Sequence, residues 1–385
     1  DVRRSDPNKY YRLQSGQIEE KEKGLPPLEE INAPKDALAA QMRRLAQSLS
    51  GHRNIACTIT GGVDSRAILA HMIHNNLHPL LDITGKPTDP DVVIAKKVAD
   101  RLNSKLLFVS DSPSSTDWID EAIREADGMT GVCGIYRLYK KALCLRDKGI
   151  FLECGGLNGE MYKNSFINQD YPFYGGKPNW KHYLRLKVAT YDFPLSICGS
   201  QIADAMKDVP RVTLEWLYSH TGRTKASAYL SAGYELLQGR CAAITAMNTR
   251  YYVQYAPLME RTVVAPMFRE NPYSLEMQAF QREQVSIYCP ILKDIETDRG
   301  LTCNSDKKII EQVKSTAYLA KVGLTRIFYR GKTSERIDTC FQEGLSSPQY
   351  RAALERCKDL GIIAPSIEKL PAGIADRIFA LGTIL

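Results

Sequence analysis

The sequence lacks the patterns that mark several common protein classes. No apolar run approaches the ~18 residues of a membrane-spanning helix, and the N-terminal segment lacks a signal-peptide pattern, so we expect a cytoplasmic protein without a membrane partner. The 10 cysteines form no C-x-x-C pair, and the 6 histidines show no metal-ligand spacing. The phosphate-binding pattern G-x-x-x-x-G-K-[ST] is also absent. These absences argue against a membrane protein, a disulfide scaffold, a zinc site and a Walker-type nucleotide site.

The composition is that of an ordinary globular protein. Of the 385 residues, 44% are hydrophobic and 25% charged, and the formal net charge is +7. A mildly basic chain suits a polyanion such as ATP or tRNA, although surface balance accounts for the charge equally well. Cys57 and Cys154 lie within apolar runs, where cysteine behaves as a small buried hydrophobe. We therefore expect reduced thiols.

Short apolar stretches alternate with helical patterns over the first part of the chain. We expect strands within 54–60, 79–84, 105–110 and 149–156, and helices within 38–49, 65–76 and 90–103. This alternation predicts an α/β fold with a parallel sheet, and the pattern becomes mostly helical from about Trp180 onward. His71, His74 and His78 are expected to form a solvent-exposed helical face rather than a metal cluster.

The stretch TITGGVDSRA, Thr58 to Ala67, joins the first of these strands to its helix. Glycines allow backbone N–H groups to surround phosphate oxygens, and a helix N-terminus adds positive potential. Asp64 has the wrong charge for a phosphate unless a cation lies between them. The stretch therefore predicts a Mg²⁺-nucleotide site.

TGGVDS resembles the S-G-G-x-D-S pyrophosphate loop of N-type ATP pyrophosphatases. Within that superfamily the chain is similar to the synthetase domain of the asparagine synthetase family, whose relatives include β-lactam synthetases and lasso-peptide cyclases. Further stretches support the resemblance. They are TDPDVVIAKKVADRLN, FLECGGLNGEMY, YVQYAPLME, SDKKIIEQV and FYRGKTS. The resemblance implies a sheet of the adenine-nucleotide α-hydrolase type flanked by helices, with a mostly helical C-terminal half.

The resemblance also implies a reaction and a set of site residues. A carboxylate would attack ATP to give an acyl-adenylate and pyrophosphate, and an amine would then form an amide and expel AMP. The implied cofactors are ATP and Mg²⁺, with Mg²⁺ held by Asp64 and Glu160. The implied ATP-binding residues are Ile59, Thr60, Gly61, Gly62, Asp64, Ser65, Ile83, Asp91 and Gly155. The implied catalytic residues are Lys332, Arg330 and Glu160.

Three positions depart from the family pattern. Gly159 stands where the family has its metal-binding Asp, and Gly156 stands where it has the first Glu of G-E-G-A-D-E. Arg66 replaces a small residue after Asp-Ser, so we expect another cation at the loop.

Two alternatives to an AMP-forming ligase remain open. One is a tRNA-modifying N-type ATP pyrophosphatase, and the other is a degenerate nucleotide-binding partner protein. Residues 1–30 are expected to be a linker or the remnant of an upstream domain, 31–345 the synthetase-like domain and 346–385 a helical extension. The expected partners are a carboxylate substrate and an amine donor, with an upstream glutaminase-like domain left open and no nucleic acid expected.

Overall fold

The computed structural model covers the chain from residue 1 to 385. It describes residues 9–110, 118–126, 131–171, 173–188, 194–304, 313–314, 316–317, 345–366, 370 and 372–384. Statements about the structure below concern these residues.

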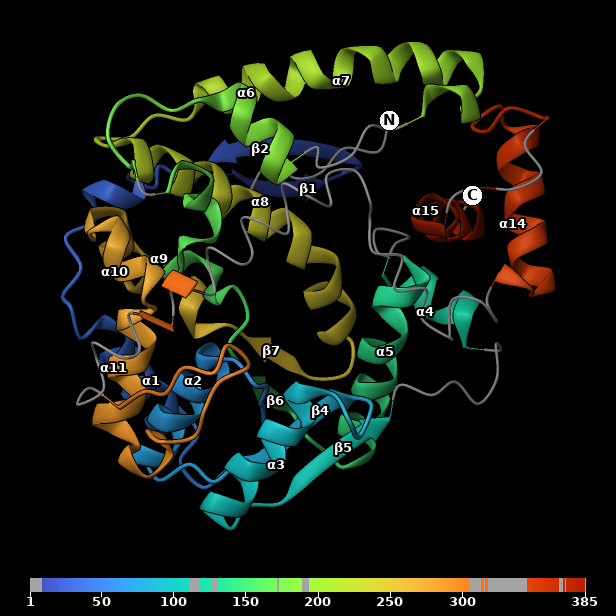
Figure 1. Ribbon diagram of the computed structural model, residues 1–385. Coiled ribbons are helices and arrows are strands. Elements are labelled where there is room, and N and C mark those ends of the chain that lie inside the picture. The colour runs from blue at the N-terminus through green and yellow to red at the C-terminus, as the bar shows by residue number, and fades with distance from the viewer. Residues whose placement is uncertain are drawn as a thin grey trace.

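A five-stranded parallel sheet lies in the lower half of the protein as seen in Figure 1. Its strand order is β5-β4-β3-β6-β7, and every neighbouring pair is parallel. The strands are β3 Ile55–Thr58, β4 Leu80–Gly85, β5 Leu106–Ser110, β6 Leu152–Cys154 and β7 Val253–Tyr255. The expected parallel α/β fold is confirmed, and the four expected strands are present. The sequence analysis did not predict β7 as a strand.

Alternate residues of β3 face opposite sides of the sheet, as the pleat requires. Ile55 and Cys57 belong to the main hydrophobic core, together with residues of the three helices α1 (Ala37–Ser48), α2 (Val63–His74) and α3 (Pro90–Leu102). Ala56 instead packs with Ala142 and Leu145 of helix α5 (Val132–Asp147). The sheet is therefore covered on both faces, as expected of parallel strands.

The helices over the sheet follow the expected order. The helices of this part are α1 Ala37–Ser48, α2 Val63–His74, α3 Pro90–Leu102, α4 Ile119–Glu125 and α5 Val132–Asp147. The chain after α5 is mostly helical, as predicted. Its helices are α6 Trp180–Tyr183, α7 Ser200–Ser219, α8 Lys225–Asn248, α9 Arg261–Val264, α10 Pro272–Glu276, α11 Ala279–Tyr288, α14 Pro348–Asp359 and α15 Ala372–Ile384. No described helix is both long and apolar enough to cross a membrane.

The last helices build a small core of their own at one side of the protein. Phe379 of α15 is buried with Ile119 and Ile123 of α4 and with Ala353 of α14. Figure 1 shows α14 and α15 beside α4, away from the sheet. The division of the chain into 1–30, 31–345 and 346–385 stays a prediction.

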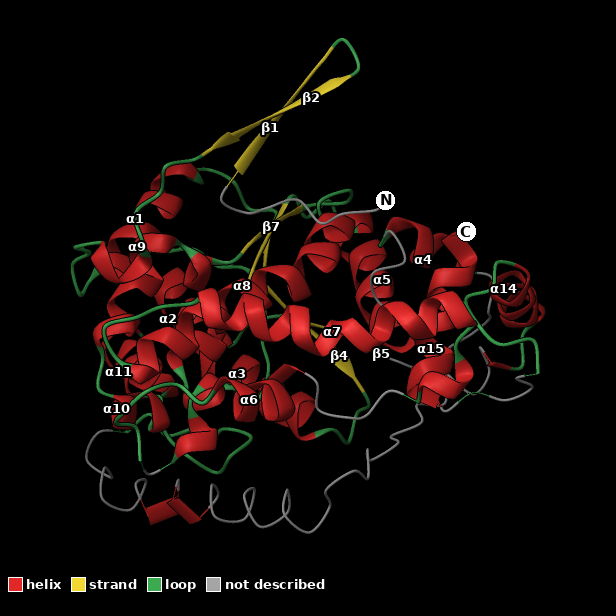
Figure 2. Cartoon of the chain, turned by 90° about the horizontal axis from the view of Figure 1, so that it is seen from above, coloured by secondary structure: helices red, strands yellow, loops and turns green. Residues whose placement is uncertain are grey.

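A β-hairpin lies within the segment expected to be a linker. Strands β1 Lys9–Gln14 and β2 Gln17–Glu22 pair antiparallel, and all but one of their residues are exposed. Ser15 and Gly16 join the strands with φ of 51° and 77°, which is the backbone of a type I′ turn. Figure 2 shows the hairpin projecting from the body of the protein.

The cysteines whose side chains the structure describes carry free thiols, and Cys57 and Cys154 are buried as expected. The expected exposed histidine face is wrong for His71. This side chain is buried, and its Nε2 lies 2.8 Å from Gln284 Oε1 of α11. Burial lowers the pKa of His71 to about 4, so the ring is neutral at pH 7. His74 and His78 are exposed.

Candidate functional site

The strand order places a switch point at the centre of the sheet. From β3 the chain proceeds to β4 and β5 on one side, and later to β6 and β7 on the other. The loops after β3 and β6 therefore leave the carboxyl edge in opposite directions. Ligands of open α/β sheets bind in the crevice at such a point.

A cavity of about 360 Å³ lies at this switch point. Its lining comes from the loops after β3 and β6, from the strand ends, and from α5 and α8. The lining residues are Thr58, Thr60, Asp64, Ser65, Leu138, Lys141, Glu153, Gly155, Gly156, Leu157, Asn158, Glu160, Leu237, Cys241, Ile244, Gln254 and Tyr255. A volume of this size suits a small ligand. The cavity thus brings together five residues expected from the sequence: Thr60, Asp64, Ser65, Gly155 and Glu160.

Backbone N–H groups of the loop between β3 and α2 donate hydrogen bonds to side-chain oxygens of the protein. Thr60 N donates to Ser65 Oγ over 3.1 Å, and Gly62 N donates to Thr60 Oγ1 over 3.2 Å. Gly61 N donates to Asp91 Oδ1 of α3 over 2.9 Å. Asp91 therefore contacts the loop, and its expected contact with ATP stays a prediction. A phosphate that approached the Gly61 N–H would have to displace the carboxylate of Asp91.

Ile59 and Ile83 were among the residues expected to bind ATP. Both are buried in the main core, and neither borders the cavity. Their expected contact with ATP stays a prediction.

Arg66 does not supply a cation to the loop surface. Its side chain is fully buried and donates to three backbone carbonyls: Nη1 to Ile295 over 2.6 Å, and Nη2 to Gly61 and Glu296 over 3.0 and 2.7 Å. Burial lowers the pKa of Arg66, although Cys303 and Asp298 oppose the shift. The expected additional cation therefore contacts the loop at Gly61, but it lies buried behind the loop and not at its surface. The guanidinium joins the loop to residues 295–296.

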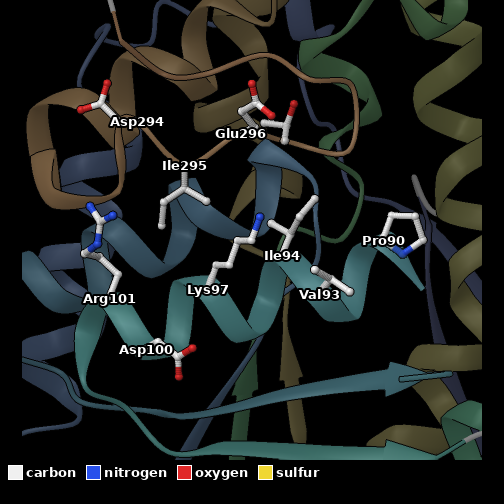
Figure 3. A pocket seen from close by; sticks show the side chains of 10 residues that line it. Pro90, Val93, Ile94, Lys97, Asp100, Arg101, Asp294, Ile295 and Glu296 are labelled. Atoms are coloured by element: carbon white, nitrogen blue, oxygen red, sulfur yellow. The ribbon is translucent and has the colours of Figure 1, made fainter. Parts of the chain in front are cut away.

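Residues 294–297 also border a second cavity, of about 790 Å³, which lies against α3 (Figure 3). In Figure 3, Lys97 and Arg101 on α3 lie opposite Asp294 and Glu296. This cavity contains none of the residues of the loop after β3. Its charges have both signs, and its lining includes none of the described site residues expected from the sequence.

A buried polar network lies beneath the first cavity. Lys141 of α5 forms ion pairs with Asp82 of β4 and Glu153 of β6, with N–O distances of 3.3 and 3.0 Å. It also donates to Thr58 Oγ1 of β3 over 2.8 Å. Thr58 Oγ1 is 3.0 and 3.2 Å from the two Asp82 oxygens and contacts Glu153 Oε1 as well. Gln254 Nε2 of β7 donates to Glu153 Oε2 over 3.1 Å.

Sheet register explains how these side chains meet. Thr58 is paired with Asp82, and Glu153 is paired with Ala56 and Gln254. All of these positions belong to the face that α5 covers, where Ala56 packs against Ala142. Three neighbouring strands thus present one polar residue each to Lys141, and the fourth, β7, presents Gln254 to Glu153.

The network holds two carboxyl groups and one ammonium almost without solvent. Burial raises the pKa of Asp82 to about 6, helped by Glu153 and opposed by Lys141 and Thr58. Burial alone would lower the pKa of Lys141, but the two carboxylates raise it above its ordinary value. The lysine is therefore charged, and Asp82 can take up a proton near pH 6.

The sequence analysis missed Asp82, Lys141, Glu153 and Gln254 as site residues. The available signal was a carboxylate inside each of two apolar strands, in PLLDIT and FLECGG. A lone charge in a buried strand is costly unless it is paired. Nothing in the local sequence identified Lys141 as that partner, because it lies on a helix and is distant in sequence from Asp82.

Asp64 lies at the start of α2, with both carboxylate oxygens engaged. Lys163 forms an ion pair with Oδ2, and Gln281 Nε2 of α11 donates to Oδ1 over 3.0 Å. Burial raises the pKa of Asp64, and Lys163 opposes this shift. Glu160 borders the same cavity.

These residues do not fit the expected Mg²⁺ site. Asp64 has no oxygen that is not already paired, and Gly159 supplies no ligand where the resembled family has an Asp. Among the described residues, no three side chains of His, Cys, Asp or Glu converge to hold a metal ion. Magnesium prefers several oxygen ligands in octahedral geometry. A cation at Asp64 would first have to displace Lys163.

Lys332 and Arg330, the expected catalytic cations, lie outside the described residues. No protein-family model matches the chain, and no curated protein matches it. The function is therefore inferred from the sequence motifs, the fold and the cavity.

Proposed function

We propose that the protein binds ATP at the loop after β3 and uses it to form an amide through an acyl-adenylate. The observation that carries this proposal is the position of TGGVDS. The loop runs from the carboxyl end of the central strand into the N-terminus of α2, beside the cavity at the switch point. That position suits a triphosphate whose α-phosphorus faces the cavity.

In the first step, a carboxylate oxygen of the substrate attacks the α-phosphorus, and the bond to the β-phosphate oxygen breaks. Pyrophosphate leaves with several negative charges. Donors near the loop would stabilise it: the hydroxyls of Thr60 and Ser65, and the first N–H groups of α2. No step is assigned to a metal at Asp64.

In the second step, an amine nitrogen attacks the acyl carbon, and the bond to AMP breaks. The amine loses a proton in this step. Glu160 and Glu153 both border the cavity and are carboxylates of the type that accepts protons. Leu138, Leu237 and Ile244 form an apolar wall that suits the carbon skeleton of the substrates.

Exchange of labelled pyrophosphate into ATP tests the first step. The assay is run with a panel of carboxylates, and exchange is expected with one chemical class only. Absence of exchange with every carboxylate, together with intact ATP binding, contradicts the ligase proposal.

A degenerate nucleotide-binding partner is the second candidate. The Lys163–Asp64 pair and the missing carboxylate at Gly159 favour it, since both remove ligands for a catalytic metal. This candidate predicts ATP binding with neither exchange nor AMP formation. No described feature specifically favours the tRNA-modifying alternative.

A further inference from the structure

Lys163 occupies the place beside Asp64 that a divalent cation would take. It directly follows the short helix η2 Gly159–Tyr162, which begins the segment after the β6 loop. Its ammonium contacts Asp64 Oδ2, and the two side chains are only 14% and 15% exposed. A partly buried pair of this kind is weakly screened by salt. Lys163 is therefore held at the start of α2, beside the loop after β3 and in contact with Asp64, which borders the cavity.

Close packing explains why this loop carries glycine at two positions. A Cβ on Gly159 would lie 2.3 Å from Asp64 Cγ, and a Cβ on Gly156 would lie 2.4 Å from Ser65 N. Neither position can hold a side chain unless the loop moves away from α2. The carboxylate that could have held a metal at 159 is thus sterically excluded, and the same close approach places Lys163 at Asp64.

An ammonium and a magnesium ion offer different contacts to a phosphate. The ammonium donates three hydrogen bonds and carries a single charge. One of its donors is used by Asp64, which leaves others for oxygens arriving at the loop. Magnesium has twice the charge but requires octahedral geometry that the described side chains do not provide.

We propose that Lys163 replaces the divalent cation at this loop and binds a phosphate group of a di- or triphosphate ligand while Asp64 holds it in place. This inference rests on the proposed ATP site. It adds Lys163 to that site as a phosphate-binding residue, which the sequence resemblance did not indicate. Phosphate binding at Asp64 then requires no Mg²⁺.

Isothermal titration of ATP into the full chain tests this, once with EDTA and once with Mg²⁺. We expect the two dissociation constants of the parent to agree within about fivefold. Lys163→Met should weaken binding in EDTA by at least about tenfold, and Mg²⁺ should recover part of the loss because Asp64 becomes available. Lys181→Met, a matched change at an exposed lysine of α6, should leave both constants unchanged. Circular dichroism establishes that each variant is folded.

The outcomes separate this inference from the ATP proposal. Parent binding that requires Mg²⁺, or a Lys163→Met constant equal to that of Lys181→Met, overturns the role of Lys163 and leaves the ATP site intact. Failure of the parent to bind ATP or inorganic pyrophosphate in either buffer overturns both. Metal-independent binding of pyrophosphate alone, weakened in Lys163→Met, supports Lys163 and contradicts ATP as the ligand.

Discussion

Replacing Lys141 with methionine should destabilise the protein strongly and in a pH-dependent manner. The change keeps much of the buried volume but removes the only ammonium that contacts Asp82 and Glu153 among the described residues. Breaking a buried ion pair by removing one partner typically costs about 3–5 kcal/mol. Here two carboxylates lose the same partner, so we expect a loss in the upper part of that range at pH 8.

The direction of the pH effect follows from the pKa of Asp82. Its folded pKa of about 6 lies above the ordinary value of 3.8 for this side chain. The folded state therefore binds more protons between these values, and the contribution of Asp82 to stability falls as pH rises through this window. A shift of this size corresponds to about 3 kcal/mol. Without Lys141 the folded pKa rises further, so the window extends to higher pH.

Urea unfolding at pH 5 and pH 8, followed by circular dichroism, measures both effects. Lys141→Met should lose at least about 1 kcal/mol more stability at pH 8 than at pH 5, relative to the parent. Lys148→Met removes an exposed lysine beyond the end of α5 and should change stability by less than about 0.5 kcal/mol at both pH values. A Lys141→Met loss equal at the two pH values, or no larger than that of Lys148→Met, would refute the buried-network reasoning.

Three further predictions concern the proposed ligase site. Asp64→Asn should lower pyrophosphate exchange by about 10²–10³-fold while circular dichroism stays unchanged; parent-like exchange would remove Asp64 from the site. Lys332 lies outside the described residues, and Lys332→Met should keep ATP affinity within about threefold. The same variant should lower amide formation at least about a hundredfold, as measured by product chromatography. Parent-like amide formation would show that the resemblance of FYRGKTS to the asparagine synthetase family is accidental. Gly159→Ala should destabilise the fold by about 1–3 kcal/mol and weaken ATP binding. In the control Gly175→Ala the added Cβ meets no atom within 4 Å, so stability and ATP binding should stay unchanged. Equal urea midpoints for the two variants would contradict the close packing of Gly159 against Asp64.

The sheet was predictable from local sequence because each buried strand is a short apolar run beside a helical pattern. β3, β4 and β5 follow this rule, and the glycine loop after β3 marks the edge where a ligand would bind. β7 was not predictable in the same way. Its sequence VQY is half-exposed and polar at its centre, and it forms a strand because its backbone pairs with β6. Propensity alone does not indicate such a pairing.

The contacts of the site were harder to predict than its location. TGGVDS identified Asp64 and its loop, but the partner of Asp64 depends on how closely the β6 loop approaches α2. That approach is set by Gly156 and Gly159, whose missing side chains looked like lost ligands in the sequence. In the fold they are the condition for the Lys163–Asp64 pair. Glycine at positions 156 and 159 therefore suggests a lost metal site when only the sequence is considered, whereas in the fold it allows the close packing that brings Lys163 to Asp64.

The buried network places one cation at the cavity, and the Lys163 pair places a second cation next to a residue that borders it. Lys141 borders the cavity from α5, and Lys163 pairs with Asp64, which borders it from the start of α2. Each is matched to carboxylates that the fold holds at the strand ends or the helix N-terminus. Fixed charges of this kind need little reorganisation when a phosphate or a carboxylate arrives. Lysines at such positions are suited to anionic ligands, and Glu160, which borders the same cavity, is a carboxylate that the proposed second step could use to accept the proton of the amine. The arrangement is therefore compatible with both steps of the reaction that we propose.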